Sequence, residues 1–133
     1  FFFKGLGYDD GLYASLIMAG ILSGQKLMMS EIMDEIEKTV ITPDLRVKIE
    51  KDSMVKLMND LSDWEHKYPV SRLDGIRIVF PSGWILVRKS VTEPCITIRL
   101  EADNIENAEE ISRTIFEKKY ANIHRIILES LLQ

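Results

Sequence analysis

The sequence predicts an α+β domain, a four-stranded and mainly antiparallel sheet with two helices on one face, preceded by helices of another domain. Three observations predict it. The elements after residue 44 follow the order strand, helix, strand, strand, strand, helix, and three successive strands favour antiparallel pairing. Each strand has one apolar face, which indicates helices on one side of the sheet only. The first helix is apolar nearly all round and needs burial of its own.

Length and charge exclude several classes of function. The chain has 133 residues, enough for one domain with a real core, and carries 17 basic against 21 acidic residues, a net charge of -4. A general attraction to nucleic acid or to an anionic membrane is not expected, so any anion must be held by a local site. The longest apolar stretch, residues 12–22, is too short to span a bilayer.

The N-terminal part reads as two helices and a linker. Asp9 and Asp10 suit the start of a helix over residues 12–22. A second helix is expected over residues 30–38, and Thr42 with the following proline indicates a linker. We therefore expect residues 1–40 to end a preceding domain and residues 41–133 to form the second. The apolar helix should pack on a neighbouring copy or form an exposed patch.

The elements of the second part follow from a change of periodicity. Alternation predicts strands at 45–50, 76–80 and 96–101, a continuous apolar run predicts a strand at 84–87, and helical spacing predicts helices at 51–64 and from 103 onward. Asp103 is expected to open the last helix, with Glu106 as its capping-box partner. The single cysteine, Cys95, cannot form an internal disulfide, which fits a cytoplasmic location.

A polar loop between two of these strands has the composition of an anion site. Arg88 offers planar, permanently charged donors, and Ser90 and Thr92 add hydroxyls. Backbone N–H groups of a tight turn can add further donors. Glu93 is placed to orient Arg88 or a hydroxyl, and Pro94 stiffens the exit. The alternative is an ordinary polar hairpin loop with a surface salt bridge.

The loop "RKSVTEP" resembles the Arg-x-Ser-Gly-Thr-Glu-Pro signature of the α-D-phosphohexomutases, the phosphomannomutase and phosphoglucomutase family. The segments "DGIRIVFPSGWILVR" and "CITIRLEAD" resemble the strands around that signature, and "YDDGLYASLIMAGIL" resembles a helix near the end of the family's third domain. The similarity extends from about Gly7 to about Phe116. It implies the TATA-box-binding-protein-like C-terminal domain of a phosphohexomutase, preceded by helices of the third domain.

The resemblance assigns roles to the loop residues. In the family this loop holds the substrate phosphate that is not transferred, so Arg88, Ser90, Val91 and Thr92 are the expected phosphate-binding residues, and Lys89 and Glu93 are possible supports. Val91 departs from the family, which usually has Gly or Asn there. A β-branched residue resists a positive φ, so we expect a reshaped turn or the loss of one contact.

The resemblance also implies what lies outside this chain. The family interconverts hexose 6-phosphates and hexose 1-phosphates through a phosphoserine and a bisphosphate intermediate, with Mg²⁺ bound in another domain. The sequence has no Ser-His-Asn-Pro-like segment and no Asp-Gly-Asp cluster. We therefore expect a piece of a longer protein that has no catalytic residue and no metal ligand of its own, and a hexose phosphate as its partner.

A different class of function stays open, a non-catalytic module that binds nucleic acid or protein on the open sheet face. Such a face needs basic or aromatic residues. The outward positions are expected to mix basic and acidic side chains without aromatic residues, namely Arg46, Lys48, Arg77, Arg99, Glu50 and Glu101. This composition argues against nucleic acid as a partner.

Overall fold

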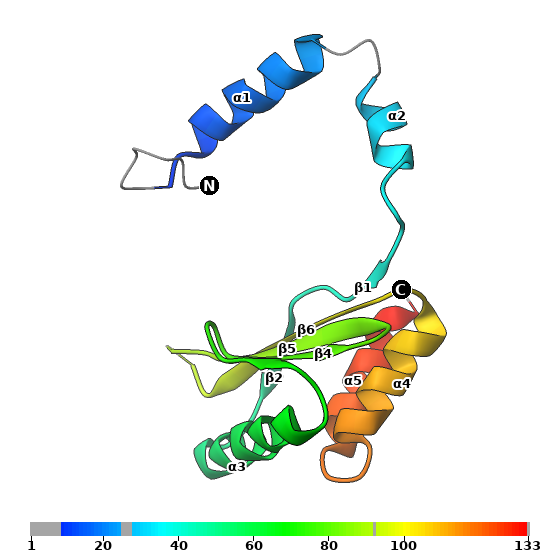
Figure 1. Ribbon diagram of the computed structural model, residues 1–133. Coiled ribbons are helices and arrows are strands. Elements are labelled where there is room, and N and C mark those ends of the chain that lie inside the picture. The colour runs from blue at the N-terminus through cyan, green and yellow to red at the C-terminus, as the bar shows by residue number, and fades with distance from the viewer. Residues whose placement is uncertain (1–8, 25–27, 92, 133) are drawn as a thin grey trace. The chain divides into compact units, whose positions relative to one another are not determined.

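A computed structural model of the chain describes residues 9–24, 28–91 and 93–132 (Figure 1). The chain forms two units, Phe1–Glu37 and Lys38–Gln133.

The first unit contains two of the predicted helices, α1 (Gly11–Gly24) and α2 (Met29–Asp34). Asp10 caps α1, because its Oδ1 accepts a hydrogen bond of 2.8 Å from the backbone N–H of Tyr13. No residue of α1 is buried, so its apolar side chains form an exposed patch. Helix α2 is shorter than predicted. Within the described ranges no helix is both long and apolar enough to cross a membrane.

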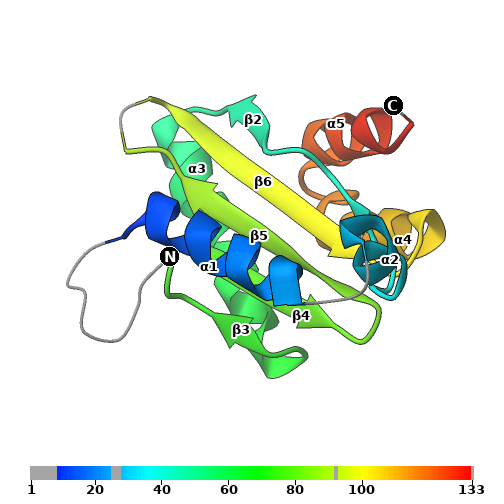
Figure 2. The same cartoon turned by 90° about the horizontal axis from the view of Figure 1, so that it is seen from above.

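The second unit is built on one antiparallel sheet. Its strands are β1 (Val40–Ile41), β2 (Leu45–Lys48), β3 (Val70–Ser71), β4 (Ile76–Phe80), β5 (Gly83–Lys89) and β6 (Cys95–Ala102). Both β1 and β2 pair with β6, and β5, β4 and β3 follow in that order across the sheet (Figure 2). The four predicted strands are therefore confirmed, and the two-residue strands β1 and β3 are additions that were too short to give a periodicity.

Three helices cover one face of this sheet (Figure 1): α3 (Lys51–Ser62), which continues into the 3₁₀ helix η1 (Asp63–His66), α4 (Ile105–Phe116) and α5 (Ala121–Leu131). The α+β class is confirmed, but the predicted pair of helices is wrong. The last predicted helix is two helices, because Tyr120 adopts φ -137° and ψ 47° and interrupts the helical backbone.

The core lies between the sheet and the helices. Strand register aligns Ile78, Ile85 and Leu100 in one row across β4, β5 and β6, and all three side chains are fully buried. Burial of a side chain of this size is worth about 1.5–3 kcal/mol relative to exposure. The strand register therefore fixes which side chains of β5 point into the core and which point to the open face of the sheet.

Two predicted boundaries need correction. The cap of α4 is Asn104, whose Oδ1 accepts from the Asn107 N–H at 2.8 Å, whereas the Asp103 N–H donates to the Ser82 carbonyl at 3.1 Å. Asp103 is thus bonded to the β4–β5 turn just beyond β6 and does not cap the helix, so the predicted capping box is wrong. The predicted linker at Thr42 is wrong as well. Thr42 is 1% exposed, donates to the Leu100 carbonyl at 2.9 Å and accepts from the Leu100 N–H at 3.0 Å.

A polar cluster joins α3 to the connection between α4 and α5. The Asp60 carboxylate accepts from the Tyr120 hydroxyl at 2.8 Å and from Lys119 Nζ at 3.1 Å. These two hydrogen bonds, with the Tyr120 bond the larger effect, lower the pKa of Asp60. Burial, together with the hydrogen bond to Asp60, raises the pKa of Tyr120 to about 12.

This cluster predicts a loss of stability at high pH. A raised tyrosine pKa favours the folded state below the ordinary value of 10.0, and this contribution is lost as the pH rises toward about 12. Tyr120→Phe removes the ionising group, so its free energy of unfolding should fall less over that window than that of the wild type. Urea denaturation at several pH values measures both slopes. Equal slopes would contradict the prediction.

Candidate functional site

The polar loop of the sequence connects β5 to β6. Pairing of the two strands ends at Lys89 and Ile96, and the Ser90 N–H donates to the Cys95 carbonyl at 3.0 Å just beyond it. The Glu93 N–H donates to Ser90 Oγ at 3.2 Å, which closes the turn from inside. The Ser90 hydroxyl accepts in this bond, so its own proton stays available to a ligand. Thr92 lies outside the described residues.

The end of the loop is packed against the domain. The Ile49 N–H donates to the Pro94 carbonyl at 3.2 Å, which ties the loop to the connection between β2 and α3. Cys95 is buried, and its Sγ donates to Glu93 Oε2 at 3.8 Å. The loop is therefore held on both sides of its tip.

Val91 lies in the loop at the position where the family usually has Gly or Asn. In the part of the chain that the structure describes, positive φ values occur only at glycines, so Val91 has no left-handed strain. Its side chain is 100% exposed and points away from the domain. The β-branched residue is thus accommodated without a positive φ, and the expected reshaping of the turn or loss of one contact stays a prediction. Lys89 is also exposed.

Arg88 lies at the end of β5 on the open face, paired with Thr97 of β6. Its Nη1 lies 3.1 Å from Oδ2 of Asp74, and the two side chains are 37% and 77% exposed. A guanidinium has five N–H donors, so one bond to a carboxylate leaves others for an anion. The sequence suggested that Glu93 orients either Arg88 or a hydroxyl, whereas the carboxylate that pairs with Arg88 is that of Asp74.

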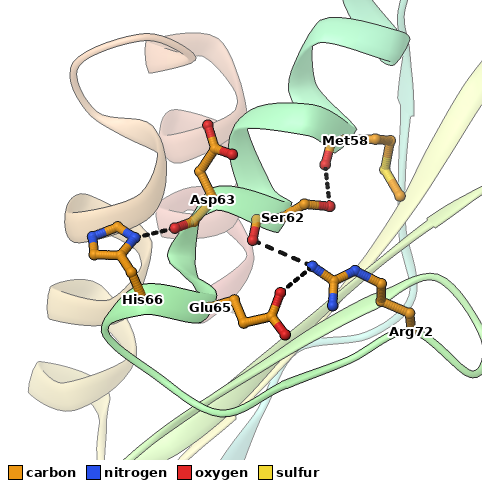
Figure 3. A network of polar contacts seen from close by, with 6 residues as sticks. All are labelled: Met58, Ser62, Asp63, Glu65, His66 and Arg72. Carbon is orange, nitrogen blue, oxygen red and sulfur yellow. Dashed lines mark hydrogen bonds and ion pairs between the residues drawn. The ribbon is translucent and has the colours of Figure 1, made fainter.

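Asp74 belongs to the turn between β3 and β4, which is anchored at its other end by Arg72. Arg72 Nη2 donates to Glu65 Oε2 at 2.6 Å and to the Ser62 carbonyl at 3.5 Å, and Figure 3 shows these contacts as dashed lines. The Arg72 hydrogen bond holds the pKa of the Glu65 carboxyl below its usual value. The turn is thereby fastened to the end of α3.

Gly75 lets this turn approach Arg88 closely. Its φ is +90°, and a Cβ added there would lie 2.4 Å from the Val87 carbonyl oxygen and 2.8 Å from Arg88 Cγ. Only a glycine fits both the backbone conformation and the space. The turn is thus seated directly on the strand that carries Arg88.

The open face around the site differs from the prediction in one respect. Trp84 lies on it, half-buried, with the Arg77 guanidinium 4.7 Å from the ring centroid, so the prediction of no aromatic residue is wrong. Alternation along β5 puts Trp84 outward because its neighbour Ile85 is in the core. Arg99 on the same face pairs with Asp44 at 3.7 Å, rather than with an acidic residue of its own strand.

The described residues contain no cluster of side chains that could bind a metal ion. Across the described ranges no group of three or more His, Cys, Asp or Glu side chains could hold a metal ion. His124 Nδ1 lies 2.8 Å from Ser112 Oγ, and His66 Nδ1 contacts the Asp63 carbonyl.

The fold and loop define a class of protein, an α+β domain that presents an arginine and a hydroxyl-bearing loop at one end of an antiparallel sheet. The family model "Phosphoglucomutase/phosphomannomutase, C-terminal domain" matches residues 45–118. A phosphomannomutase/phosphoglucomutase of Pseudomonas aeruginosa is 32% identical over 113 residues, which are 83% of this chain and 24% of that protein. A phosphoglucomutase of Neisseria gonorrhoeae is 31% identical over 124 residues, 90% of this chain and 27% of that protein.

A solved structure agrees with these relatives. The crystal structure of a phosphoglucomutase/phosphomannomutase family protein from Burkholderia thailandensis superposes with a TM-score of 0.62 at 26% identity, covering 95% of this chain and 25% of that one. The chain belongs to the phosphoglucomutase/phosphomannomutase family. It spans about a quarter of the length of the curated relatives it matches.

Asp74 is the residue at this site that sequence analysis missed. The signal available was the Asp74-Gly75 pair, a common turn sequence, directly before the strand that pairs with β5. Periodicity alone does not say which side chain of a turn reaches the neighbouring strand.

Gly75 provides a test of how this site is built. Gly75→Ala should lower the free energy of unfolding by about 2 kcal/mol or more, because the backbone conformation is strained and the new Cβ meets a backbone oxygen. Gly20→Ala is the matched control, since a Cβ there meets nothing within 4 Å and lies within a helix. Urea denaturation monitored by tryptophan fluorescence compares them. Equal stability of Gly75→Ala and wild type would contradict the close approach.

Proposed function

We propose that the second unit is the substrate-phosphate-binding domain of a phosphohexomutase, in which the loop after β5 holds the phosphate that is not transferred. The observation that carries the proposal is the placement of Arg88 and Ser90 beside a closed, anchored turn in a chain of this family. The chemistry of the donors fits a phosphate monoester, whose oxygens accept several hydrogen bonds at once.

Each loop residue has a role in this proposal. Arg88 supplies charge and its remaining N–H donors, and Ser90 donates its hydroxyl proton. Thr92 adds a second hydroxyl on the strength of the signature alone. The backbone at Val91 contributes without its side chain, which faces solvent. Lys89 and Glu93 support the loop rather than bind, Glu93 through its N–H to Ser90.

The proposal extends to the longer protein to which such a domain would belong. That protein would interconvert hexose 6-phosphate and hexose 1-phosphate through a phosphoserine and a bisphosphate, with Mg²⁺ held by residues outside this chain. A charge-based cradle suits this reaction, because either phosphate of the bisphosphate must fit the same loop. The chain alone would bind without catalysing. A cytoplasmic location goes with this proposal.

The open sheet face and the apolar helix α1 raise two further possibilities. The relatives named above are phosphomutases, and nothing in their names favours the module that binds nucleic acid or protein on its open face. Self-association through the apolar side chains of α1 stays a prediction, and light scattering over a dilution series tests it.

Titration of the chain with glucose 6-phosphate tests the proposal. Arg88→Ala should weaken the binding of glucose 6-phosphate by about tenfold or more, because a hydrogen bond to a charged group contributes about 1.5–3 kcal/mol. Chemical-shift changes of backbone amides in the loop, measured by NMR, report the dissociation constant. Arg99→Ala is the control, since it removes the same charge from the same face. An unchanged affinity of Arg88→Ala, or equal losses in both variants, would contradict the proposal.

A further inference from the structure

We propose that Asp74 is a positioning residue that holds the Arg88 guanidinium ready for the substrate phosphate. The inference rests on the proposed function, because it assigns the preparation of that site to a second segment of the chain. The contact that carries it is the 3.1 Å ion pair between Arg88 Nη1 and Asp74 Oδ2. Asp74 does not touch the substrate in this proposal and acts through Arg88.

The turn that carries Asp74 is built to keep the carboxylate in place. On one side of Asp74, Arg72 fastens the chain to Glu65 and Ser62. On the other, Gly75 packs at a distance that no side chain would allow against Val87 and Arg88. Asp74 is exposed, yet the residues on either side of it are fixed, so its carboxylate returns to the same place beside β5.

A carboxylate near a phosphate site has two opposing effects. Its charge repels the anion, and its hydrogen bond orders the arginine. The repulsion is weak here, because the carboxylate is 77% exposed and water and salt screen it. Ordering matters more, because an arginine with free rotamers loses that freedom when it binds the phosphate. The ion pair with Asp74 restricts the Arg88 side chain before the ligand binds, so less conformational entropy is lost on binding. This is preorganisation of the site.

The donor count allows both contacts at once. The ion pair uses Nη1, and a guanidinium has donors on its other nitrogens that can take phosphate oxygens. Glu93 does not compete for this role, because its described contacts run to Ser90 and Cys95. Arg88 is therefore held from the β3–β4 turn and can reach toward the β5–β6 loop.

Substitutions at Asp74 separate ordering from charge. Asp74→Ala removes both, whereas Asp74→Asn removes the charge and keeps an oxygen that accepts from Nη1. With glucose 6-phosphate and, separately, inorganic phosphate as probes, Asp74→Ala should bind about three- to tenfold more weakly than wild type, and Asp74→Asn within about twofold of it. Glu129→Ala on α5 is the charge control, because it also removes an exposed acidic partner of an arginine.

A measurement without ligand complements the titration. NMR relaxation of the Arg88 Nε–H should show faster motion in Asp74→Ala than in wild type or Asp74→Asn. Backbone spectra of each variant verify the fold, which an exposed position should leave intact.

The outcomes are distinct. Tighter or unchanged binding by Asp74→Ala, while Arg88→Ala binds weakly, overturns the role of Asp74 and leaves the proposed function standing. Equal losses in Asp74→Ala and Asp74→Asn overturn it too, because charge rather than ordering would then matter. If wild type does not bind either probe, or if Arg88→Ala binds as well as wild type, the proposed function fails and the role of Asp74 fails with it.

Discussion

The pairing of β5 with β6 is the constraint on which the rest of the domain depends. The two strands are in register from Gly83 opposite Ala102 to Lys89 opposite Ile96. This register sets the face of the sheet to which each side chain between them points. Ile85 and Val87 enter the core, which forces Trp84 and Arg88 onto the open face. A shift of one residue would turn Arg88 into the core without a partner, and an unpaired buried charge costs a large part of the stability of a domain this size.

The same pairing explains why a short loop can serve as a site. Its two ends are fixed by strand hydrogen bonds, and the bond between the Ser90 N–H and the Cys95 carbonyl shortens the free segment further. Glu93 then closes the turn on Ser90 through its N–H. Donors on a loop held in this way lose little freedom when a ligand binds, so most of their interaction energy contributes to affinity. The loop is also bonded to Ile49, outside the hairpin, through Pro94.

Local patterns in the sequence predict the features that neighbouring residues determine by themselves. Alternation located β2, β4 and β6, since each has one buried face, and the resemblance located the loop. The predictions were wrong where tertiary contacts determine the local structure. Thr42 read as a linker beside a proline, yet its hydroxyl pairs with Leu100, 58 residues away. Helical spacing predicts one helix from residue 103 onward, yet α4 ends at Phe116, and Tyr120, with a non-helical backbone, precedes α5. The Asp103 N–H donates to the Ser82 carbonyl in the β4–β5 turn, and the helix begins only after Asn104.

Val91 and Gly75 differ in backbone conformation and in the space available for a side chain. The family signature has a small residue in the loop, where this chain has a β-branched one, and the loop accommodates it at an ordinary φ with the side chain in solvent. The glycine at a left-handed φ is in the neighbouring turn, where the approach to Val87 and Arg88 leaves no space for a side chain. A glycine is therefore needed at position 75, where two segments meet, whereas the side chain of Val91 meets only solvent and can be larger.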